Sequence, residues 1–249
     1  MKHALTIATV LLLSSASARA DALTDLRGAL AKLTARDAIR ATITIETVDR
    51  GDDDDPPQIG KATFDAEHGP QGLRVTYAPE LIARAQQEAR EQRANPDKPA
   101  PARDGMRRID PAELIESLDA AGSLIRLLDS AALVKEQRTS ASGRSLQQLT
   151  MKITPKLSKS NAKHVRNLEV TLVLNIGEDG VPVSADLHEK VKAKFLLMSF
   201  ESETHRTWAF ARHGDRLVAL RRIETSTGSG MGQKFENRQT LTVSPKNGA

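Results

Sequence analysis

Apolar and polar residues alternate with a period of two through most of the chain after about Ala132. This alternation is typical of β-strands that have one buried and one exposed face. Turn sequences such as Ser142-Gly143 and Glu178-Asp179-Gly180 separate the alternating segments and suit hairpins, because Gly and Asp accept positive φ. The strands that this pattern predicts are residues 133–139, 146–154, 168–176, 183–200, 204–212, 217–227 and 234–243. We expect them to pair as a meander of consecutive antiparallel neighbours.

The N-terminal part of the chain contains one segment with helical spacing of apolar residues, followed by segments with the alternation of β-strands. Leucines recur at three- and four-residue intervals in residues 21–36, which predicts an amphipathic helix. Residues 39–48 alternate and predict a strand. Two further strands are expected at residues 59–65 and 73–77, on either side of the turn Gly69-Pro70-Gln71-Gly72.

Proline positions mark the helices in the middle of the chain. Pro79 fits the first turn of a helix over residues 80–93. Residues 94–106 contain three prolines and little that would be buried, so we interpret them as an exposed connector. The sequence Asp110-Pro111-Ala112-Glu113 supplies an N-cap, a proline at the first helical position and a glutamate at N3, so a long helix is expected to run from there to about Ser130. Helices on one amphipathic sheet predict an α+β, mainly β fold with two layers.

The first twenty residues have the composition of a cleavable signal peptide. Lys2 and His3 precede an apolar stretch over residues 4–13, and the segment ends on Ala18-Arg19-Ala20. The apolar stretch is too short to span a membrane, so the mature protein is expected to be soluble, not membrane-spanning, and to form a single periplasmic domain over residues 21–249. Secretion beyond the periplasm is the second possibility. The chain has no cysteine, so neither a lipid-attachment cysteine nor a disulfide is expected.

Charge and composition exclude several classes of function. The chain has 36 Lys and Arg against 32 Asp and Glu, and loss of the signal peptide removes Lys2 and Arg19 but no acid. The mature protein is therefore nearly neutral although the sequence pI is 9.4, and no nucleic-acid partner is expected. Aromatic residues make up only 3% of the chain, so the core must be mainly aliphatic.

The segment 183–200 holds our candidate binding residues. Its odd positions from Val183 to Leu197, except Glu189, are apolar, whereas His188, Lys190, Lys192 and Lys194 form a basic ladder on the other face. Four of the seven aromatic residues lie between Phe195 and Phe210. This pattern fits either a plain core cluster or the wall of a ligand site. The candidate ligand-binding residues are Val191, Phe195, Leu197, Trp208 and Phe210, and the candidate partner-contact residues are Lys190, Lys192 and Lys194.

Other motifs favour ordinary structural roles. The run Asp52 to Asp55 lacks the ligand spacing of a calcium loop and is interpreted as a solvated turn. The glycine-rich residues 228–232 have no helix after them to bind phosphate, and they are interpreted as a hairpin connection or a bent segment. The four histidines of the strand-rich half (His164, His188, His205 and His213) have no short ligand spacing. No serine lies in a nucleophile elbow. We therefore expect no metal, no cofactor and no catalytic residue.

Residues 21–80 resemble the opening of the periplasmic outer-membrane lipoprotein carriers, the LolA- and LolB-like proteins. The similar segments are Gly60-Lys61-Ala62-Thr63-Phe64 and Pro70-Gln71-Gly72-Leu73-Arg74-Val75-Thr76-Tyr77-Ala78-Pro79. The resemblance implies a curved antiparallel meander sheet, an unclosed half-barrel covered by two or three helices, whose apolar face accepts acyl chains. No functional residue is transferred from that family, which carries more cavity-lining aromatic residues than this chain has.

Three functional hypotheses follow from the sequence. The first is a non-enzymatic periplasmic binding or carrier protein for a lipid, lipoprotein or other amphiphile. The second is an envelope structural or regulatory protein that binds another protein, with the lysine ladder as its contact surface. The third is a periplasmic hydrolase.

The mature protein is predicted to begin at Asp21, because Ala18 and Ala20 place small residues where signal peptidase requires them. Intact-mass analysis of the exported protein checks this. A mass that retains residues 1–20 would contradict both the cleavage and the localisation.

Overall fold

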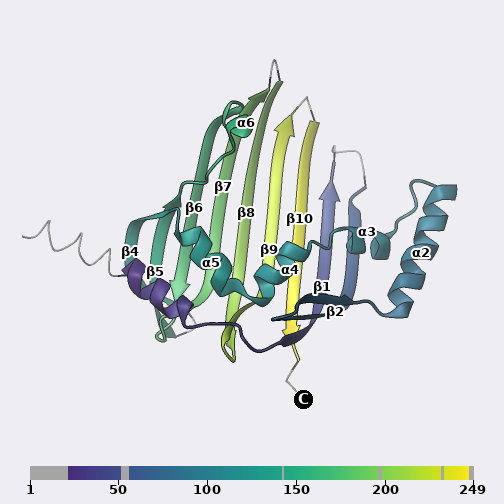
Figure 1. Ribbon diagram of the computed structural model, residues 1–249. Helices are drawn as coiled ribbons and strands as arrows, with labels where there is room; N and C mark the ends of the chain where they lie inside the picture. Colours follow the sequence, from purple (N-terminus) through teal and green to yellow (C-terminus); the bar gives the residue numbers. More distant parts are fainter. Residues whose placement is uncertain (1–21, 52–55, 142, 196–197, 231–232, 247–249) are drawn as a thin grey trace, which may run out of the picture.

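A single open antiparallel sheet of ten strands dominates the computed structural model (Figure 1). The structure describes residues 22–246 apart from 52–55, 142, 196–197 and 231–232. The strand order is β3-β2-β1-β10-β9-β8-β7-β6-β5-β4, so β3 and β4 form the two edges and the sheet does not close into a barrel. The strands are β1 (Ile39–Arg50), β2 (Gln58–Gly69), β3 (Gly72–Thr76), β4 (Ala131–Ala141), β5 (Arg144–Ile153), β6 (Val165–Ile176), β7 (Pro182–Phe195), β8 (Met198–His213), β9 (Arg216–Gly230) and β10 (Gln233–Pro245).

The helices pack mainly against one face of this sheet. They are a helix over residues 22–31, α2 (Pro79–Ala94), α3 (Pro101–Arg107), α4 (Pro111–Leu118), α5 (Ala120–Leu128) and the single turn α6 (Lys159–Ala162). The face of the sheet that meets α3, α4, α5 and the first helix is called the covered face here, and the opposite face the open face. The predicted α+β, mainly β class and the meander from β4 to β10 are confirmed.

Alternation along the strands divides apolar from polar residues between these faces. In β1, Ile43 and Ile45 are fully buried on the covered face, whereas Thr44 and Glu46 point to the open face. The buried residues form two clusters. One lies between β5–β8 and the first helix with α5 and includes Leu30, Leu128 and Leu172, and the other lies between β1, β2, β10 and α4. Both clusters are aliphatic in the main, as the low aromatic content predicts.

Arg216 fixes the chain where it passes from the first helix into β1. It lies at the start of β9, is 2% exposed, and donates hydrogen bonds to the carbonyl oxygens of Ala35 (2.7 Å) and Asp37 (3.0 Å from Nε). The neighbouring Asp215 accepts hydrogen bonds from the Arg36 amide at 2.7 Å and the Thr34 hydroxyl at 3.0 Å. The β8–β9 turn thus holds residues 34–37, which explains why the first helix ends at residue 31 and not at the expected residue 36.

One long helix and one long strand that the sequence predicts are each divided into two elements in the structure. The helix expected from Asp110 to Ser130 breaks at Asp119, whose φ of −144° and ψ of 73° are not helical. As a result, α4 covers one core cluster and α5 the other. The strand expected over residues 183–200 is a hairpin in which Phe195 pairs with Met198. Apolar residues continue through that hairpin, so the sequence gives no turn signal there.

The proline-rich segment 94–106 is exposed only in part. Residues 95–99 are exposed as predicted, but the prediction is wrong for residues 100–106, because α3 packs directly on β2 and buries Ala100 and Ala102. A Cβ on Gly105 would lie 2.4 Å from the Lys61 carbonyl carbon, and one on Gly60 would lie 2.8 Å from the Gly105 amide nitrogen. Glycine at both positions lets the two backbones touch.

The predicted N-cap of α4 is confirmed, since an Asp110 carboxylate oxygen accepts a hydrogen bond from the Ala112 amide at 2.8 Å. We expect Asp110→Ala to lower the free energy of unfolding by about 1 kcal/mol, measured by urea denaturation. Asp119→Ala is a matched control, because Asp119 is the N-cap of α5 but makes no side-chain cap hydrogen bond. Equal losses in the two variants would contradict the capping role of Asp110.

Candidate functional site

The helices shield only part of the covered face of the sheet. Helices α4 and α5 cross the sheet below the end that carries the β7–β8 and β9–β10 hairpin connections (Figure 1). We call this end the distal end. Between the helices and the distal end, the covered face of β7–β10 carries half-buried residues such as Val191, Ser202 and Ser226.

A buried charge cluster lies where the helical cover ends. Arg222 in β9 is 5% exposed, and its Nη2 donates hydrogen bonds to Glu113 of α4 at 3.0 Å and to Glu224 at 2.5 Å. Glu224 also accepts a hydrogen bond from Arg206 in β8, and Gln239 in β10 donates one to Glu113 at 2.8 Å. The Arg222 Nε and Nη1 atoms are buried and have no protein partner among the described residues. The cluster therefore ties α4 to three strands and keeps two donors unused.

In this cluster, neighbouring groups of opposite charge shift the pKa values more than burial does. Burial on its own raises the pKa of Glu224, but hydrogen bonds and charges from Arg206 and Arg222 outweigh it and hold the pKa below its usual range. Burial likewise lowers the pKa of Arg222, but Glu113 and Glu224 outweigh it and raise the pKa above its usual value. Arg222 and Glu224 are therefore both charged at neutral pH. The Arg206 guanidinium lies 5.7 Å from the centroid of the Trp208 ring.

An aromatic pair lies on the same face near the distal end. The Phe200 and Phe235 rings stack with their centroids 6.1 Å apart and their planes inclined by 14°. They come from β8 and β10, which are separated by β9, and they meet because β9 has glycine beneath them. A Cβ on Gly228 would lie 2.4 Å from the Phe235 ring, and one on Gly230 would lie 3.0 Å from the Phe200 ring. Phe200 remains 40% exposed.

Half-buried apolar side chains continue this surface toward β6. Val191 and Leu168 are cross-strand partners on the covered face, and Ala193 lies opposite Phe200. Between the rings and Arg222, the side chains of Thr204 and Ser226 share a hydrogen bond of 3.0 Å. The distal half of the covered face is thus a strip with the Phe200 and Phe235 rings at one end and the charged groups of Arg222 and Glu224 at the other. We call it the amphipathic strip.

The structure separates the candidate ligand-binding residues. Phe210 is 9% exposed and belongs to the core cluster beneath the helices, and the half-buried Trp208 packs against that cluster. Val191 lies on the amphipathic strip, six strand positions from the partner of Trp208, or about 20 Å. Leu197 and the side chain of Phe195 lie outside the described residues. Sequence reasoning missed Phe235 and Arg222, because only the strand register places them beside Phe200 and Glu113.

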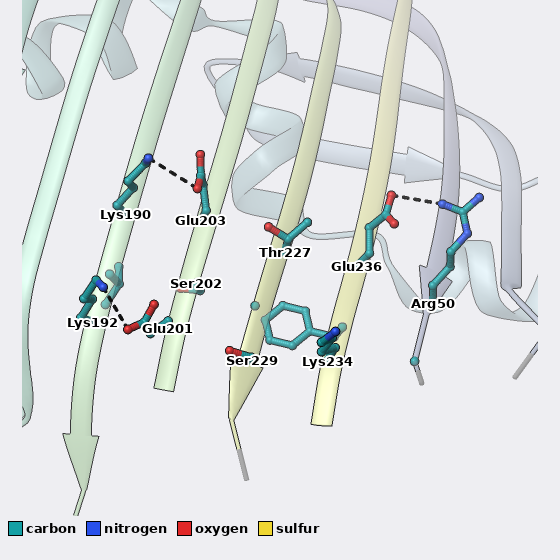
Figure 2. Close-up of a pocket in the computed structure, with 14 residues that line it drawn as sticks. Arg50, Lys190, Lys192, Glu201, Ser202, Glu203, Thr227, Ser229, Lys234 and Glu236 are labelled. Carbon is teal, nitrogen blue, oxygen red and sulfur yellow. Dashed lines mark hydrogen bonds and ion pairs between the residues drawn. The ribbon is translucent and has the colours of Figure 1, made fainter. Parts of the chain in front are cut away.

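A trough of about 550 Å³ lies on the open face (Figure 2). Its floor is Thr227, Gly228 and Ser229 of β9, whose short side chains lie between longer ones on the neighbouring strands. Two rows of charged residues form its walls (Arg50, Lys190, Lys192, Glu201, Glu203, Lys234 and Glu236). The trough lies above the small residues of β9. On the covered face, two phenyl rings fill the space beside the same glycines.

The lysine ladder lies on the open face, as the alternation predicts, but glutamates of β8 largely neutralise it. Lys190 lies 3.6 Å from Glu203 and Lys192 lies 3.0 Å from Glu201 (Figure 2). The Glu203 pKa is lowered, first by its hydrogen bond with His188. Lys194 is exposed and has no ion pair within the described part of the chain. The ladder is therefore a charge-paired surface, not a uniformly basic one.

The remaining motifs have ordinary positions where the structure describes them. The run Asp52 to Asp55 lies outside the described residues, as do Met231 and Gly232, while Gly228 and Gly230 belong to β9. His188 and His205 face each other across β7 and β8 and bind Glu203 and Asp186 respectively. Within the described ranges, no three His, Asp or Glu side chains are grouped to hold a metal, and no helix is long and apolar enough to cross a membrane.

Neither the protein-family models nor the curated proteins that were compared with this sequence match it.

We expect Glu224→Gln to lower the free energy of unfolding at pH 7 by about 1 to 2 kcal/mol, because two guanidinium groups lose a charged acceptor. Since the Glu224 pKa is lowered by folding, this stabilisation is present above the unfolded pKa of about 4.3 and is lost as the pH falls through the folded pKa. The difference between wild type and variant, measured by urea denaturation at pH 7 and at a pH below the unfolded pKa of Glu224, should therefore be smaller at the lower pH. Glu189→Gln is the control, because Glu189 is half-buried on β7 and has no ion pair in the described chain. A constant difference at both pH values would contradict the charge pairing.

Proposed function

We propose that this chain is a non-enzymatic envelope protein that binds a lipid, lipoprotein or other amphiphile on the amphipathic strip. The observation that carries the proposal is the stacked, partly exposed pair of Phe200 and Phe235 on a part of the covered face that no described helix shields. A contiguous exposed apolar patch marks a binding site for a protein, a ligand or a membrane. The signal peptide places the protein outside the cytoplasm in this proposal.

The ligand lies beside the helices in this proposal and not beneath them. Under the helices the covered face is filled, because Leu114, Leu128 and Leu172 are all completely buried. Close packing of this kind leaves no room for an acyl chain. The distal half instead offers Val191, Ala193 and Leu168 as a half-buried apolar surface next to the rings.

The strip also suits a ligand with one polar end. Gly228 lies six positions after Arg222 in β9, which is about 20 Å along the strand. An apolar chain on the rings therefore leads toward the hydroxyl groups of Thr204 and Ser226 and then toward the charge cluster. The resemblance of residues 21–80 to lipoprotein carriers points to the same class of ligand.

The trough on the open face favours a second function, the binding of another envelope protein. Its walls present ammonium and carboxylate groups side by side, and its floor presents the Thr227 and Ser229 hydroxyl groups (Figure 2). Such a surface complements an extended polar segment of a partner better than an acyl chain. Lys190 and Lys192, two of the candidate partner-contact residues, line this trough.

Binding of a fluorescent fatty-acid probe tests the first function. We expect wild-type protein to bind the probe, and Phe200→Ala and Phe235→Ala each to weaken binding about tenfold or more, because each removes a large apolar contact. Gly228→Ala should act in the same direction, since its Cβ would displace the Phe235 ring. Fluorescence titration gives the dissociation constants.

Val134→Ala is the matched control, because Val134 is an exposed apolar residue on the edge strand β4, far from the strip in the strand order. It should leave probe binding unchanged. Thermal melts of the variants check folding, and small shifts are expected because Phe200 is 40% exposed. Wild-type protein that binds no probe would overturn the amphiphile site and leave the trough, with a protein partner, as the better function.

A further inference from the structure

One long stretch of the chain carries positive charge only. Between Glu136 and Glu169 there is no Asp or Glu, while Lys and Arg recur throughout. The basic residues in its second half are Lys152, Lys156, Lys159, Lys163 and Arg166. Residues 154–164 connect β5 to β6 and include the short turn α6.

The fold places this connection at the distal end of the sheet, beside the end of β7 (Figure 1). The Lys194 amide donates a hydrogen bond to the His164 carbonyl oxygen at 2.8 Å, and Val165 pairs with Ala193. The end of the lysine ladder therefore joins the basic connection. The resulting surface, which we call the basic end, consists of Lys156, Lys159, Lys163, Arg166, Lys192 and Lys194, all of them exposed.

Few acidic groups compensate for the basic end. Of its six members only Lys192 has an ion pair in the described chain, with Glu201 at 3.0 Å. Glu169 lies across from Lys190, just inside this surface. The acidic run Asp52 to Asp55 lies outside the described residues, and β1, the strand that precedes it in the chain, is four strands from β7 in the sheet. The positive charge is thus concentrated over β6, β7 and α6.

An exposed apolar residue lies within the same surface. Leu157 is 40% exposed and stands between Lys156 and Lys159 in the chain. Basic residues around an exposed leucine combine the two contributions that hold a protein on a membrane surface, namely attraction to anionic headgroups and burial of apolar area at the interface. Either contribution alone is weak.

We propose that the basic end docks the protein on the surface of a bilayer that contains anionic phospholipid. The charges lie at the distal end of long strands. Docking therefore turns the distal end of the sheet toward the lipid and the opposite end, where the C-terminus of the chain lies, away from it (Figure 1). The lysines contact phosphate groups and Leu157 enters the interfacial region. This inference does not rest on the amphipathic strip, because neither Arg222 nor the phenyl rings belong to the basic end.

Co-sedimentation with lipid vesicles tests the docking. We expect wild-type protein to bind vesicles of phosphatidylglycerol and phosphatidylcholine, to bind pure phosphatidylcholine vesicles far less, and to lose binding at high salt. The triple variant Lys156→Gln, Lys159→Gln, Lys163→Gln should bind the anionic vesicles about 100-fold more weakly, at about fivefold for each charge.

The triple variant Lys32→Gln, Arg93→Gln, Arg138→Gln is the matched control. It removes the same charge from three exposed residues outside the basic end, none of which has an ion pair in the described chain. This control should bind like wild type. Equal losses in the two triple variants, or wild-type binding that does not depend on anionic lipid, would overturn the proposal.

A second pair of variants tests the apolar contact. Leu157→Gln should weaken binding to anionic vesicles several-fold, whereas Ile82→Gln on α2, where the isoleucine is 39% exposed, should not. Fatty-acid probe binding should be unchanged in all of these variants, so the two proposals fail separately. Vesicle binding that is lost on addition of inorganic phosphate at constant ionic strength would show a phosphate site and overturn bilayer docking.

Discussion

The helices of this protein are too short to cover its sheet, and most features of the molecule depend on that mismatch. Helices α4 and α5 have eight and nine residues, so each is about 12 to 14 Å long. The central strands β7 and β8 have 14 and 16 residues and extend for about 46 to 53 Å. One part of the covered face can therefore be buried as an aliphatic core, while the distal part must form another surface. The aromatic pair and the hydroxyl groups between it and Arg222 occupy that part.

The charge cluster around Arg222 marks the boundary between these two parts. Glu113 belongs to the first turn of α4, three residues after the Asp110 cap, so the residues that start the helix also fix it to β9. A buried arginine with two carboxylates adds little net stability compared with apolar residues, but loss of one partner leaves a charge buried alone. The arrangement therefore specifies where α4 lies more than it stabilises the fold. It also places polar groups at the point where the apolar core stops.

The parts of the fold that follow from local sequence were predictable. Period-two alternation identifies the strands, and Asp110 identifies the start of α4 because its cap depends on residues next to it. The hairpin between β7 and β8 was missed because apolar residues continue through it, and the break at Asp119 was missed because no proline or glycine marks it. The contact of Gly105 with β2 depends on a residue more than 40 positions away. The stack of Phe200 on Phe235 likewise requires the register of three strands, which alternation alone does not fix.

The small residues of β9 connect the two faces of the sheet. From Thr225 to Gly230 the strand contains only Thr, Ser and Gly, so it forms a depression between longer side chains on both faces. Phenyl rings from β8 and β10 fill the depression on the covered face, which a Cβ on Gly228 would prevent. On the open face the neighbours are charged, and mutual ion pairs hold them along the walls and away from the floor. One stretch of sequence thus produces an apolar surface and a polar trough back to back, near the same end of the sheet that carries the basic residues. If that end faces a bilayer, the amphipathic strip lies close to the lipid from which an amphiphile would come.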